Sequence, residues 1–392
     1  MARRVSIITD NPTKMNKIVK FATLALLLGT GNALLAQEAE NKEPVYKITE
    51  TVNVKHTPVD NQGSSGTCWC FAGIGFVEAE IQRLYGKEFN LSEMFVVRNA
   101  WTEKVAKFTR MHGNSTLSQG GEVCDVLYMI DKYGMMPEAD YSGKVIGEER
   151  HMHAEMNEVI SSVARAIIKN GNKKISPAGP KAVQGVLDAY LGEAPEEFTV
   201  DGKKYTPKSF AEKYRIDPAN YIEICSFTSE EYNKPCMVEI PDNWTWTPAY
   251  NMPLDKLMEA VDYALEHGYT LGWAQDVSNS GFSRKEGVGI VPEDPKDENL
   301  WKEIVAEKKV TDEDHQMAYD NWDAGDDHSM LVVGIAKDQN GNKYYKIKNS
   351  WGDAGPYHGY WYCSEQYLRQ YTIFFTLHKD ALSKAMRKDL GL

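Results

Sequence analysis

The chain has 392 residues, of which 42% are hydrophobic and 26% are charged, and its net charge is −12. Such a composition indicates a globular protein with one large domain or two closely packed subdomains. The acidic balance argues against a nucleic-acid partner, because nucleic acids are bound by basic surfaces. Six cysteines without a Cys-x-x-Cys pair argue against both a structural zinc site and a disulfide-dense scaffold.

Residues 1–36 have the pattern of a secretory signal peptide. A short basic segment, Met15–Lys20, precedes the apolar run Phe21–Leu28, and small residues then lead to Ala36, where we predict cleavage. The apolar run is too short for a membrane anchor. The segment carries five basic side chains and one acidic side chain, so its removal takes the net charge from −12 to −16. We therefore expect a secreted or periplasmic protein without a membrane span; the alternative is an amphipathic cytosolic terminus.

The first half of the chain predicts helices. The stretch Cys68–Ala79 is apolar on nearly every side, which indicates a buried helix, and its glycines suggest that neighbours pack closely on it. Ser92 predicts the capped start of a second helix, and a third is expected at 122–133, after Gly120–Gly121. Residues 141–255 are mostly charged, and we expect a helical insertion there.

The last third of the chain predicts strands, which gives an α+β fold class. An amphipathic helix is expected first, at 254–267. Runs with strand character follow at 269–274, 330–335, 344–348, 360–362 and 372–377. Asn340–Gly341 is a strong signal for a hairpin. We therefore expect a helical subdomain at 56–140, the insertion at 141–255, a β subdomain at 256–377 and a tail at 378–392.

Cys68 has the surroundings that a cysteine nucleophile requires. It begins the buried helix, where free backbone N–H groups and the helix dipole favour a thiolate. Gln62 precedes it by six residues, across a loop of two glycines and three small residues that can fold tightly. The side-chain amide of Gln62 could then reach the oxyanion that forms beside the Cys68 N–H.

His328 and Asn349 lie at the two ends of the predicted hairpin. Because its strands are antiparallel, these ends come together. Asn349 can then accept a hydrogen bond from one imidazole nitrogen and leave the other nitrogen facing Cys68. Trp351 follows two residues later and is expected to shield this hydrogen bond from water. Such chemistry requires no metal and no organic cofactor.

Three segments resemble the signatures of papain-like cysteine peptidases. Gln62–Trp69 resembles the nucleophile signature, Asp327–His328 the histidine signature and Asn349–Gly352 the asparagine signature, in the same order and widely separated. The resemblance implies that residues 37–392 form a papain-like domain, in which the site lies in a cleft between a helical subdomain and an antiparallel β subdomain. The catalytic residues would be Gln62, Cys68, His328 and Asn349, and the substrate-binding residues Gly120, Gly121, Trp69, Ala274 and Trp351.

Two further stretches are similar to the bleomycin hydrolase and aminopeptidase C branch of that family. Gly192–Lys234 resembles its helical insertion, and Gly272–Val277 resembles its strand before the histidine. The similarity implies an aminopeptidase that acts on peptides, often as a homo-hexamer whose sites face an inner chamber. The short stretch 37–61 also leaves no room for a folded inhibitory propeptide. Enclosure of the active sites in an inner chamber would be another way to restrain the peptidase.

The tail departs from this branch. In the resembling proteins a C-terminal arm enters the cleft, and its carboxylate holds the amino terminus of the substrate. Here fifteen residues, 378–392, follow the last strand and look helical, so we expect a shortened arm. An endopeptidase with an open cleft therefore stays an alternative to an aminopeptidase.

Two other functions deserve comparison. A catalytically silent papain-like fold could bind peptides, although a silent relative would be expected to have lost one of the catalytic residues. A transglutaminase-like acyl transferase also uses cysteine and histidine, but the Gln62 spacing and Asn349 fit a peptidase better. Cys225 and Cys236, with only ten residues between them, are the first pair to test for a disulfide.

The remaining motifs have simpler interpretations. His151 and His153 could bind a metal, but a solvated helix without metal is the preferred interpretation. Trp244 and Trp246 could form a binding platform, yet we expect them to pack the insertion onto the core. Cys70 is expected to be a small core residue, because a side chain two positions along a helix points away from Cys68.

Overall fold

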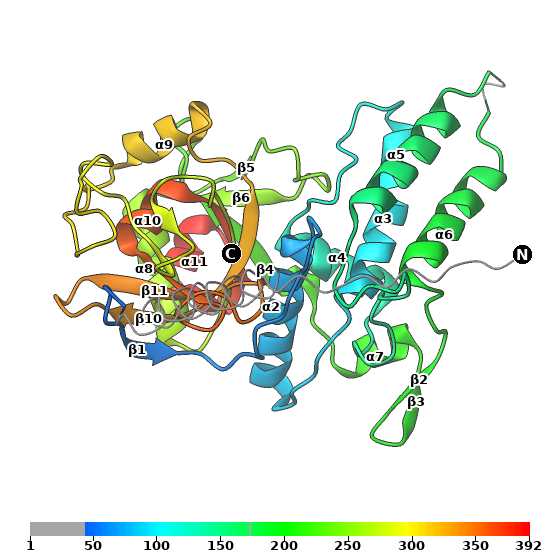
Figure 1. Ribbon diagram of the computed structural model, residues 1–392, viewed down its shortest axis with the longest axis horizontal. Helices are drawn as coiled ribbons and strands as arrows, with labels where there is room; N and C mark the ends of the chain where they lie inside the picture. Colours follow the sequence, from blue (N-terminus) through cyan, green and yellow to red (C-terminus); the bar gives the residue numbers. More distant parts are fainter. Residues whose placement is uncertain (1–43, 172–173) are drawn as a thin grey trace, which may run out of the picture. The chain divides into compact units, whose positions relative to one another are not determined.

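The chain folds into a helical part and a sheet part that meet along one central helix (Figure 1). This computed structural model describes residues 44–171 and 174–392. The predicted signal peptide lies outside the described residues, and its cleavage stays a prediction. Among the helices described, none combines the length and the hydropathy that a membrane crossing requires. The predicted α+β class is confirmed.

The central helix α2 (Cys68–Tyr85) is buried on nearly every side, as its sequence predicts. It packs against α4 (Val123–Tyr133) and against the strand β10 (His328–Lys337). Gly73 allows the approach of α4, because a Cβ at this position would lie 2.4 Å from Val126 Cγ2. α2 therefore joins the two parts of the fold and carries Cys68 at its N-terminus.

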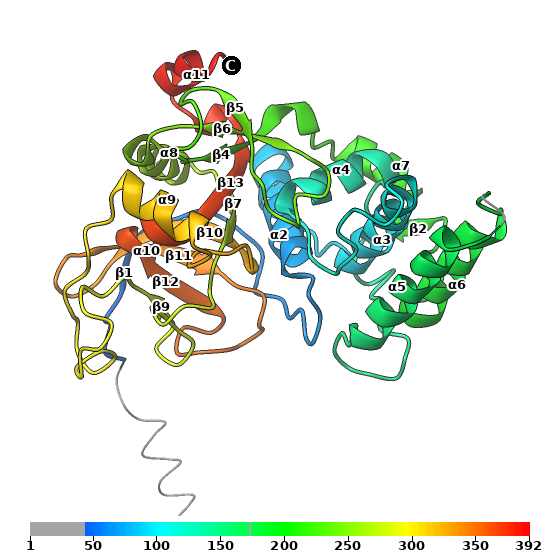
Figure 2. The same ribbon diagram turned by 90° about the horizontal axis from the view of Figure 1, so that it is seen from above.

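The other helices of the first half lie on the side of α2 away from the sheet (Figure 2). They are α3 (Glu93–Arg110), α5 (Ala154–Ile168), α6 (Ala178–Leu191) and α7 (Pro207–Lys213). The hairpin of β2 (Phe198–Val200) and β3 (Lys203–Tyr205) precedes α7. Ser92 caps α3 as predicted, since its hydroxyl accepts from the Phe95 N–H at 3.0 Å. One apolar core unites these helices with α2.

The sheet has eleven strands in the described part of the chain. Besides β10 they are β1 (Thr49–Asn53), β4 (Tyr221–Cys225), β5 (Pro235–Met237), β6 (Pro248–Asn251), β7 (Leu271–Gln275), β8 (Phe282–Ser283), β9 (Val288–Gly289), β11 (Lys343–Lys348), β12 (Tyr360–Ser364) and β13 (Thr372–His378). Their order is β5-β6-β4-β13-β7-β10-β11-β12-β9-β8, with β1 also paired to β10. All pairs are antiparallel except β4 with β6 and β9 with β12.

The expectation of a helical insertion throughout 141–255 is wrong for its last part. A 3-10 turn at Pro218–Asn220 leads into residues 221–251, which add β4, β5 and β6 to the sheet. Pro235 and Pro248 concealed these strands, because proline argues against a central strand but is tolerated as a first residue. Before β4, the last α-helix of the insertion ends at Lys213, and the β2–β3 hairpin separates it from α6.

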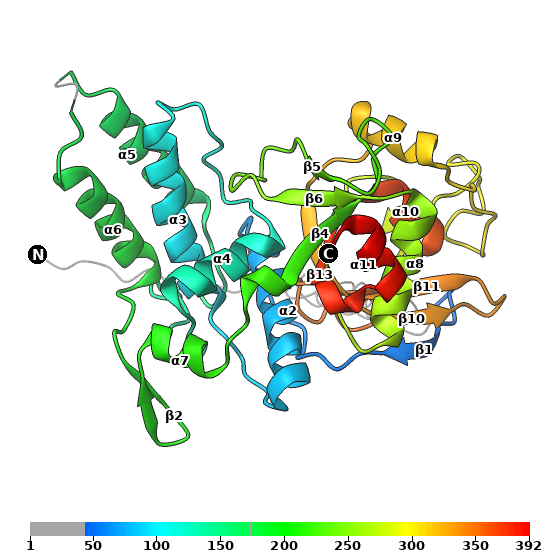
Figure 3. The same ribbon diagram turned by 180° about the vertical axis from the view of Figure 1, so that it is seen from behind.

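Four helices accompany the sheet, namely α8 (Leu254–Glu266), α9 (Asp312–Asp320), α10 (Glu365–Tyr371) and α11 (Lys384–Leu390). Figure 3 shows α8 and α11 together on one side of the sheet. The segment after β13 begins with a 3-10 turn, Lys379–Ala381, and continues into α11, as the helical tail prediction expected. Leu382, Met386 and Leu390 bury this segment in the same apolar core as α8.

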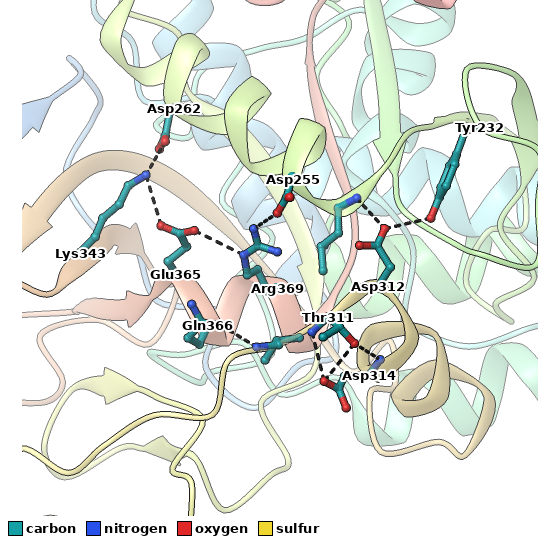
Figure 4. A network of polar contacts seen from close by, with 12 residues as sticks. Tyr232, Asp255, Asp262, Thr311, Asp312, Asp314, Lys343, Glu365, Gln366 and Arg369 are labelled. Carbon is teal, nitrogen blue, oxygen red and sulfur yellow. Dashed lines mark hydrogen bonds and ion pairs between the residues drawn. The ribbon is translucent and has the colours of Figure 1, made fainter.

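Polar contacts hold α8, α9 and α10 together (Figure 4). Arg369 on α10 forms ion pairs with Asp255 on α8 and with Glu365. The Asp312 carboxylate accepts from the Leu254 N–H at 3.0 Å and from Tyr232 Oη at 2.9 Å. Pro253, at the N-terminus of α8, has no side-chain acceptor for the first N–H groups of that helix. Asp312, on α9, supplies this acceptor.

Replacing Asp312 with alanine is expected to lower the free energy of unfolding by about 1–2 kcal/mol, as the loss of a helix cap does. The midpoint of urea denaturation measures this change. Glu313→Ala, at the exposed neighbouring position, is the matched control and should leave the midpoint near that of the wild type. Equal midpoints for both variants would show that Asp312 does not stabilise the N-terminus of α8.

The sulfur atoms of Cys225 and Cys236 lie 3.6 Å apart on β4 and β5, as reduced thiols. The two strands lie on either side of β6, so a bond between the sulfurs would require the strand ends to move closer as well as the side chains to rotate. The predicted export would expose both thiols to oxidants. We expect a thiol oxidant such as oxidised glutathione to convert this pair into a disulfide and to raise the free energy of unfolding by about 2–4 kcal/mol. Peptide mapping without reductant identifies the linked pair. Cys225→Ala should abolish the gain, and a different linkage would contradict the assignment.

Candidate active site

Cys68 lies half-buried at the start of α2, beside the first residues of β10. The backbone N–H groups of Ser329 and Trp69 lie near its sulfur and oppose the rise in the pKa of the thiol that burial causes. Ser329 directly follows His328, so the sulfur lies next to the histidine that the sequence paired with it. The packing of α2 on β10 thus unites two residues that are 260 positions apart in the chain.

His328 and Asn349 meet as predicted from the hairpin of β10 and β11. Their strands pair antiparallel, with Leu331 opposite Lys348. His328 Nε2 lies 2.8 Å from Asn349 Oδ1, and both side chains are buried. Because an amide oxygen only accepts, Nε2 carries the hydrogen, and Nδ1 of the neutral ring is the basic nitrogen.

The Trp351 ring stacks on the His328 imidazole, with ring centroids 4.9 Å apart and planes inclined by 29°. The Arg284 guanidinium lies 4.5 Å from the centroid of Trp351. This arrangement covers the His328–Asn349 hydrogen bond on one side. The predicted contact of Trp351 with that pair is therefore present.

The buried site favours the neutral forms of both reacting groups. Burial raises the pKa of the Cys68 thiol to about 12, although the N–H groups on its sulfur oppose that rise. Burial likewise lowers the pKa of His328 to about 4, against the effect of its bond with Asn349. Loss of hydration thus acts against the thiolate that the helix N-terminus led us to expect.

The Gln62 side chain is fixed by two hydrogen bonds. Its Oε1 accepts from Ser350 Oγ at 2.6 Å, and its Nε2 donates to the Ser65 carbonyl at 2.7 Å. The loop turns at Gly63, whose φ of +62° favours glycine. One hydrogen of the Gln62 amide is left for another acceptor. Gln62 thus comes from the loop that precedes Cys68 and is tied to the residue after Asn349.

His151 and His153 support this loop, which corrects the expectation that they lie on a solvated helix. Each is only 4% exposed. The Ser64 N–H donates to the His151 carbonyl at 2.8 Å, and the His153 N–H donates to the Ser64 carbonyl at 3.2 Å. No group of three or more metal-ligating side chains occurs in the part of the chain that the structure describes. The sequence held no signal for this packing.

The two buried histidines are expected to make stability depend on pH. Burial lowers the pKa of both to about 4, from 6.5. The unfolded chain therefore binds more protons in this window, and the free energy of unfolding falls as the pH drops from 6.5 towards 4. We expect the double variant His151→Leu/His153→Leu to lose less stability than the wild type over this range. Urea denaturation at several pH values measures both slopes, and equal slopes would contradict the linkage.

Gly120 and Gly121 form a narrow backbone segment beside Trp69. The Trp69 Nε1 donates to the Gln119 carbonyl at 2.8 Å, and a Cβ on Gly121 would lie 3.1 Å from the Trp69 ring. Lys104 Nζ donates a hydrogen bond to the Gly120 carbonyl. Trp69 is 1% exposed and supports the segment from behind, so it offers a substrate almost no surface.

Ala274 is also 1% exposed and packs in a core cluster with Phe374 and Cys225. Its backbone pairs with Ser329, the residue that contacts the Cys68 sulfur. Ala274 therefore lies behind the site. Its side chain is not exposed and so cannot make the predicted contact with substrate. Trp244 is buried as expected, whereas Trp246 is 57% exposed and lies over Lys107.

The segment after β13 lies at the other end of α2. His378, the last residue of β13, stacks on Tyr269, and Arg83 lies 4.4 Å from the centroid of the Tyr269 ring. Arg83 is fifteen residues along α2 from Cys68, which corresponds to about 22 Å of helix. The residues that follow His378 then pack on α8, away from Cys68.

Comparison with known proteins gives consistent results. A model of the peptidase C1-like family matches residues 13–391. Aminopeptidase C from Lactobacillus delbrueckii subsp. lactis is 24% identical over 99% of this chain and 94% of that protein. Aminopeptidase C from Lactococcus lactis subsp. cremoris is 25% identical over 91% of this chain and 88% of that protein. The crystal structure of pepw from Lactobacillus rhamnosis HN001 shares the fold, with a TM-score of 0.68 and 19% identity over 98% of this chain and 95% of that one.

Proposed function

We propose that this chain, which belongs to the peptidase C1-like family and is a papain-like cysteine peptidase, is an aminopeptidase with Cys68 as its nucleophile. One observation supports the assignment of the residues. Cys68 begins α2, this helix packs on β10, whose first residue is His328, and His328 Nε2 lies 2.8 Å from Asn349 Oδ1. This packing supports a connected arrangement of nucleophile, base and orienting group.

The proposed reaction begins with attack of the Cys68 sulfur on the substrate carbonyl carbon, while the thiol proton passes to His328 Nδ1. The free hydrogen of the Gln62 amide and the Cys68 N–H stabilise the oxyanion. His328 then gives its proton to the leaving amine as the carbon–nitrogen bond breaks. A water molecule, deprotonated by His328, releases the acyl group from Cys68.

The remaining residues have supporting roles in this proposal. Asn349 holds His328 with Nδ1 towards the sulfur, and Trp351 keeps water from that hydrogen bond. The backbone of Gly120 and Gly121 is available to pair with the substrate beside Cys68. These roles follow the geometry and need no metal or organic cofactor.

Specificity for the amino end is supported by the relatives that bear the name aminopeptidase C. An endopeptidase is the second candidate, because residues 379–392 pack on α8 and leave the Cys68 end of α2 uncovered by that segment. The two candidates differ in whether a substrate without a free amino group is cut.

Cleavage of one short peptide under reducing conditions, with a free and with an acetylated amino terminus, separates them by mass spectrometry. Stepwise loss of single residues from the free peptide alone is the expected result. Internal cleavage of both peptides would replace the aminopeptidase with an endopeptidase. If neither peptide is cut by a folded protein, the proposed activity is wrong and a peptide-binding role takes its place.

A further inference from the structure

Two carboxyl side chains tie the backbone just before His328 to the loop that follows β7. Asp276 Oδ2 accepts a hydrogen bond from the Gly325 N–H at 2.9 Å. In the opposite direction, Asp327 Oδ1 accepts from the Val277 N–H at 2.9 Å. Each segment therefore supplies one side chain and one amide to the other, and the second segment continues directly into His328.

The pairing of β7 with β10 is loose where His328 begins its strand. His328 lies opposite Gln275, the last residue of β7. The Asp327 N–H donates to the Gln275 carbonyl at 3.4 Å, and Gln275 Nε2 donates to the His328 carbonyl at 3.4 Å. Ordinary N–H···O hydrogen bonds measure about 2.9–3.0 Å. The two side-chain links are therefore the shorter contacts at this end of the strand.

Asp276 is itself firmly anchored in the core. Its side chain is 6% exposed, and its Oδ1 accepts from the Ser278 N–H at 2.8 Å and from Asn279 Nδ2 at 3.1 Å. Its backbone carbonyl accepts from Tyr367 Oη at 2.7 Å, and Tyr367 is fully buried on α10. A buried network with its members bonded in this way is rigid. The link to the segment before His328 therefore starts from a fixed point.

The link requires a carboxylate at position 276. Burial raises the pKa of Asp276, and the Gly325 N–H opposes this rise. Two donors face Oδ1, whereas the Gly325 N–H faces Oδ2. An asparagine has a single acceptor oxygen, which would turn towards the two donors and leave an NH₂ group against the Gly325 N–H. Only a carboxylate serves its own loop and the neighbouring segment at once.

Resting on the proposed function, we infer that Asp276 is a positioning residue, which acts through the segment 325–327 and fixes the backbone of His328 relative to Cys68. Asn349 holds the far end of the His328 ring, at Nε2. Asp276 fixes the backbone from which that ring extends. A shift of about 1 Å in a reacting group can lower the rate about 100-fold. Because Asp276 is buried and acts through another segment, its loss should lower kcat and leave KM nearly unchanged.

Asp276→Asn tests the inference directly, because it keeps an acceptor for the turn of its own loop and removes the acceptor for the Gly325 N–H. We expect kcat on a free peptide to fall about 10-fold, with KM within about twofold of the wild-type value. Asp327→Asn is the matched comparison. It removes a carboxylate beside His328 but keeps the one oxygen that the Val277 N–H requires, so it should retain more of the wild-type kcat. Equal losses of kcat would assign the effect to charge and overturn the inference.

Ser383→Ala controls for a simple loss of stability. It removes the hydroxyl that caps α11, in the segment that packs on α8, and should leave kcat at the wild-type value. If Asp276→Asn fails to fold, Asp327→Ala removes the reciprocal link from an exposed position and should lower kcat in the same way. An unchanged kcat in the folded variants, or a rise in KM in its place, would overturn the inference while the peptidase stands. If the wild type cleaves no peptide, the proposed function fails and this inference fails with it.

Discussion

Replacing Cys68 with alanine is expected to reduce peptide cleavage by at least about a thousandfold, because the acyl group then has no nucleophile to accept it. Removing one sulfur at the start of α2 should leave the core of the fold intact. The measurement is kcat/KM on a free peptide, together with circular dichroism to verify folding.

Cys124→Ala is the matched control for this experiment. Cys124 is the other half-buried cysteine in the described chain, and it lies on α4. Its replacement should leave cleavage close to that of the wild type. If Cys68→Ala loses much less than about a thousandfold of the wild-type turnover, or if Cys124→Ala loses its turnover, Cys68 is not the nucleophile.

The second large effect is expected from Asn349→Ala. Asn349 accepts from His328 Nε2 at 2.8 Å and thereby directs Nδ1 towards the sulfur. Without this bond the imidazole can rotate or adopt the other tautomer, so kcat should fall about 100-fold. KM should change little, because Asn349 is buried behind His328 and touches no substrate.

Asn349→Asp distinguishes orientation from simple loss of packing. Aspartate keeps an acceptor oxygen near Nε2, so this variant should retain more of the wild-type kcat than Asn349→Ala does. The active fraction of each preparation is counted with a thiol-reactive inhibitor before rates are compared. A rise in KM at unchanged kcat would contradict the orienting role.

Local sequence patterns predicted the parts of the site that follow from one hairpin and one helix. Asn340–Gly341 fixed the turn, and the antiparallel strands then had to bring His328 and Asn349 together. The buried character of α2 predicted its central position, and its glycines predicted the close approach of α4. These features depend on residues near one another in the chain or on strong periodicity.

Features that depend on distant packing could not be predicted in this way. Asp242 reaches Gly120 only because the loop before β6 folds back over the start of α4, and no periodicity records that contact. His151 and His153 likewise became buried because their segment pairs with Ser64. The expectation of a thiolate considered the helix N-terminus and omitted the loss of hydration, which raises the pKa of the Cys68 thiol.

The hexamer and the export that the sequence predicts stay separate predictions, testable by solution mass and by the mature amino terminus.

The most direct test of the central claim is to map the site of covalent labelling by a peptidyl thiol-reactive inhibitor with a free amino end. Digestion and mass spectrometry should place the label on Cys68 alone, and His328→Ala should slow labelling strongly because the proton has no acceptor. Cleavage of a test peptide should fall in proportion to the labelled fraction. A label on Cys124, or full labelling of Cys68 with cleavage undiminished, would contradict the account.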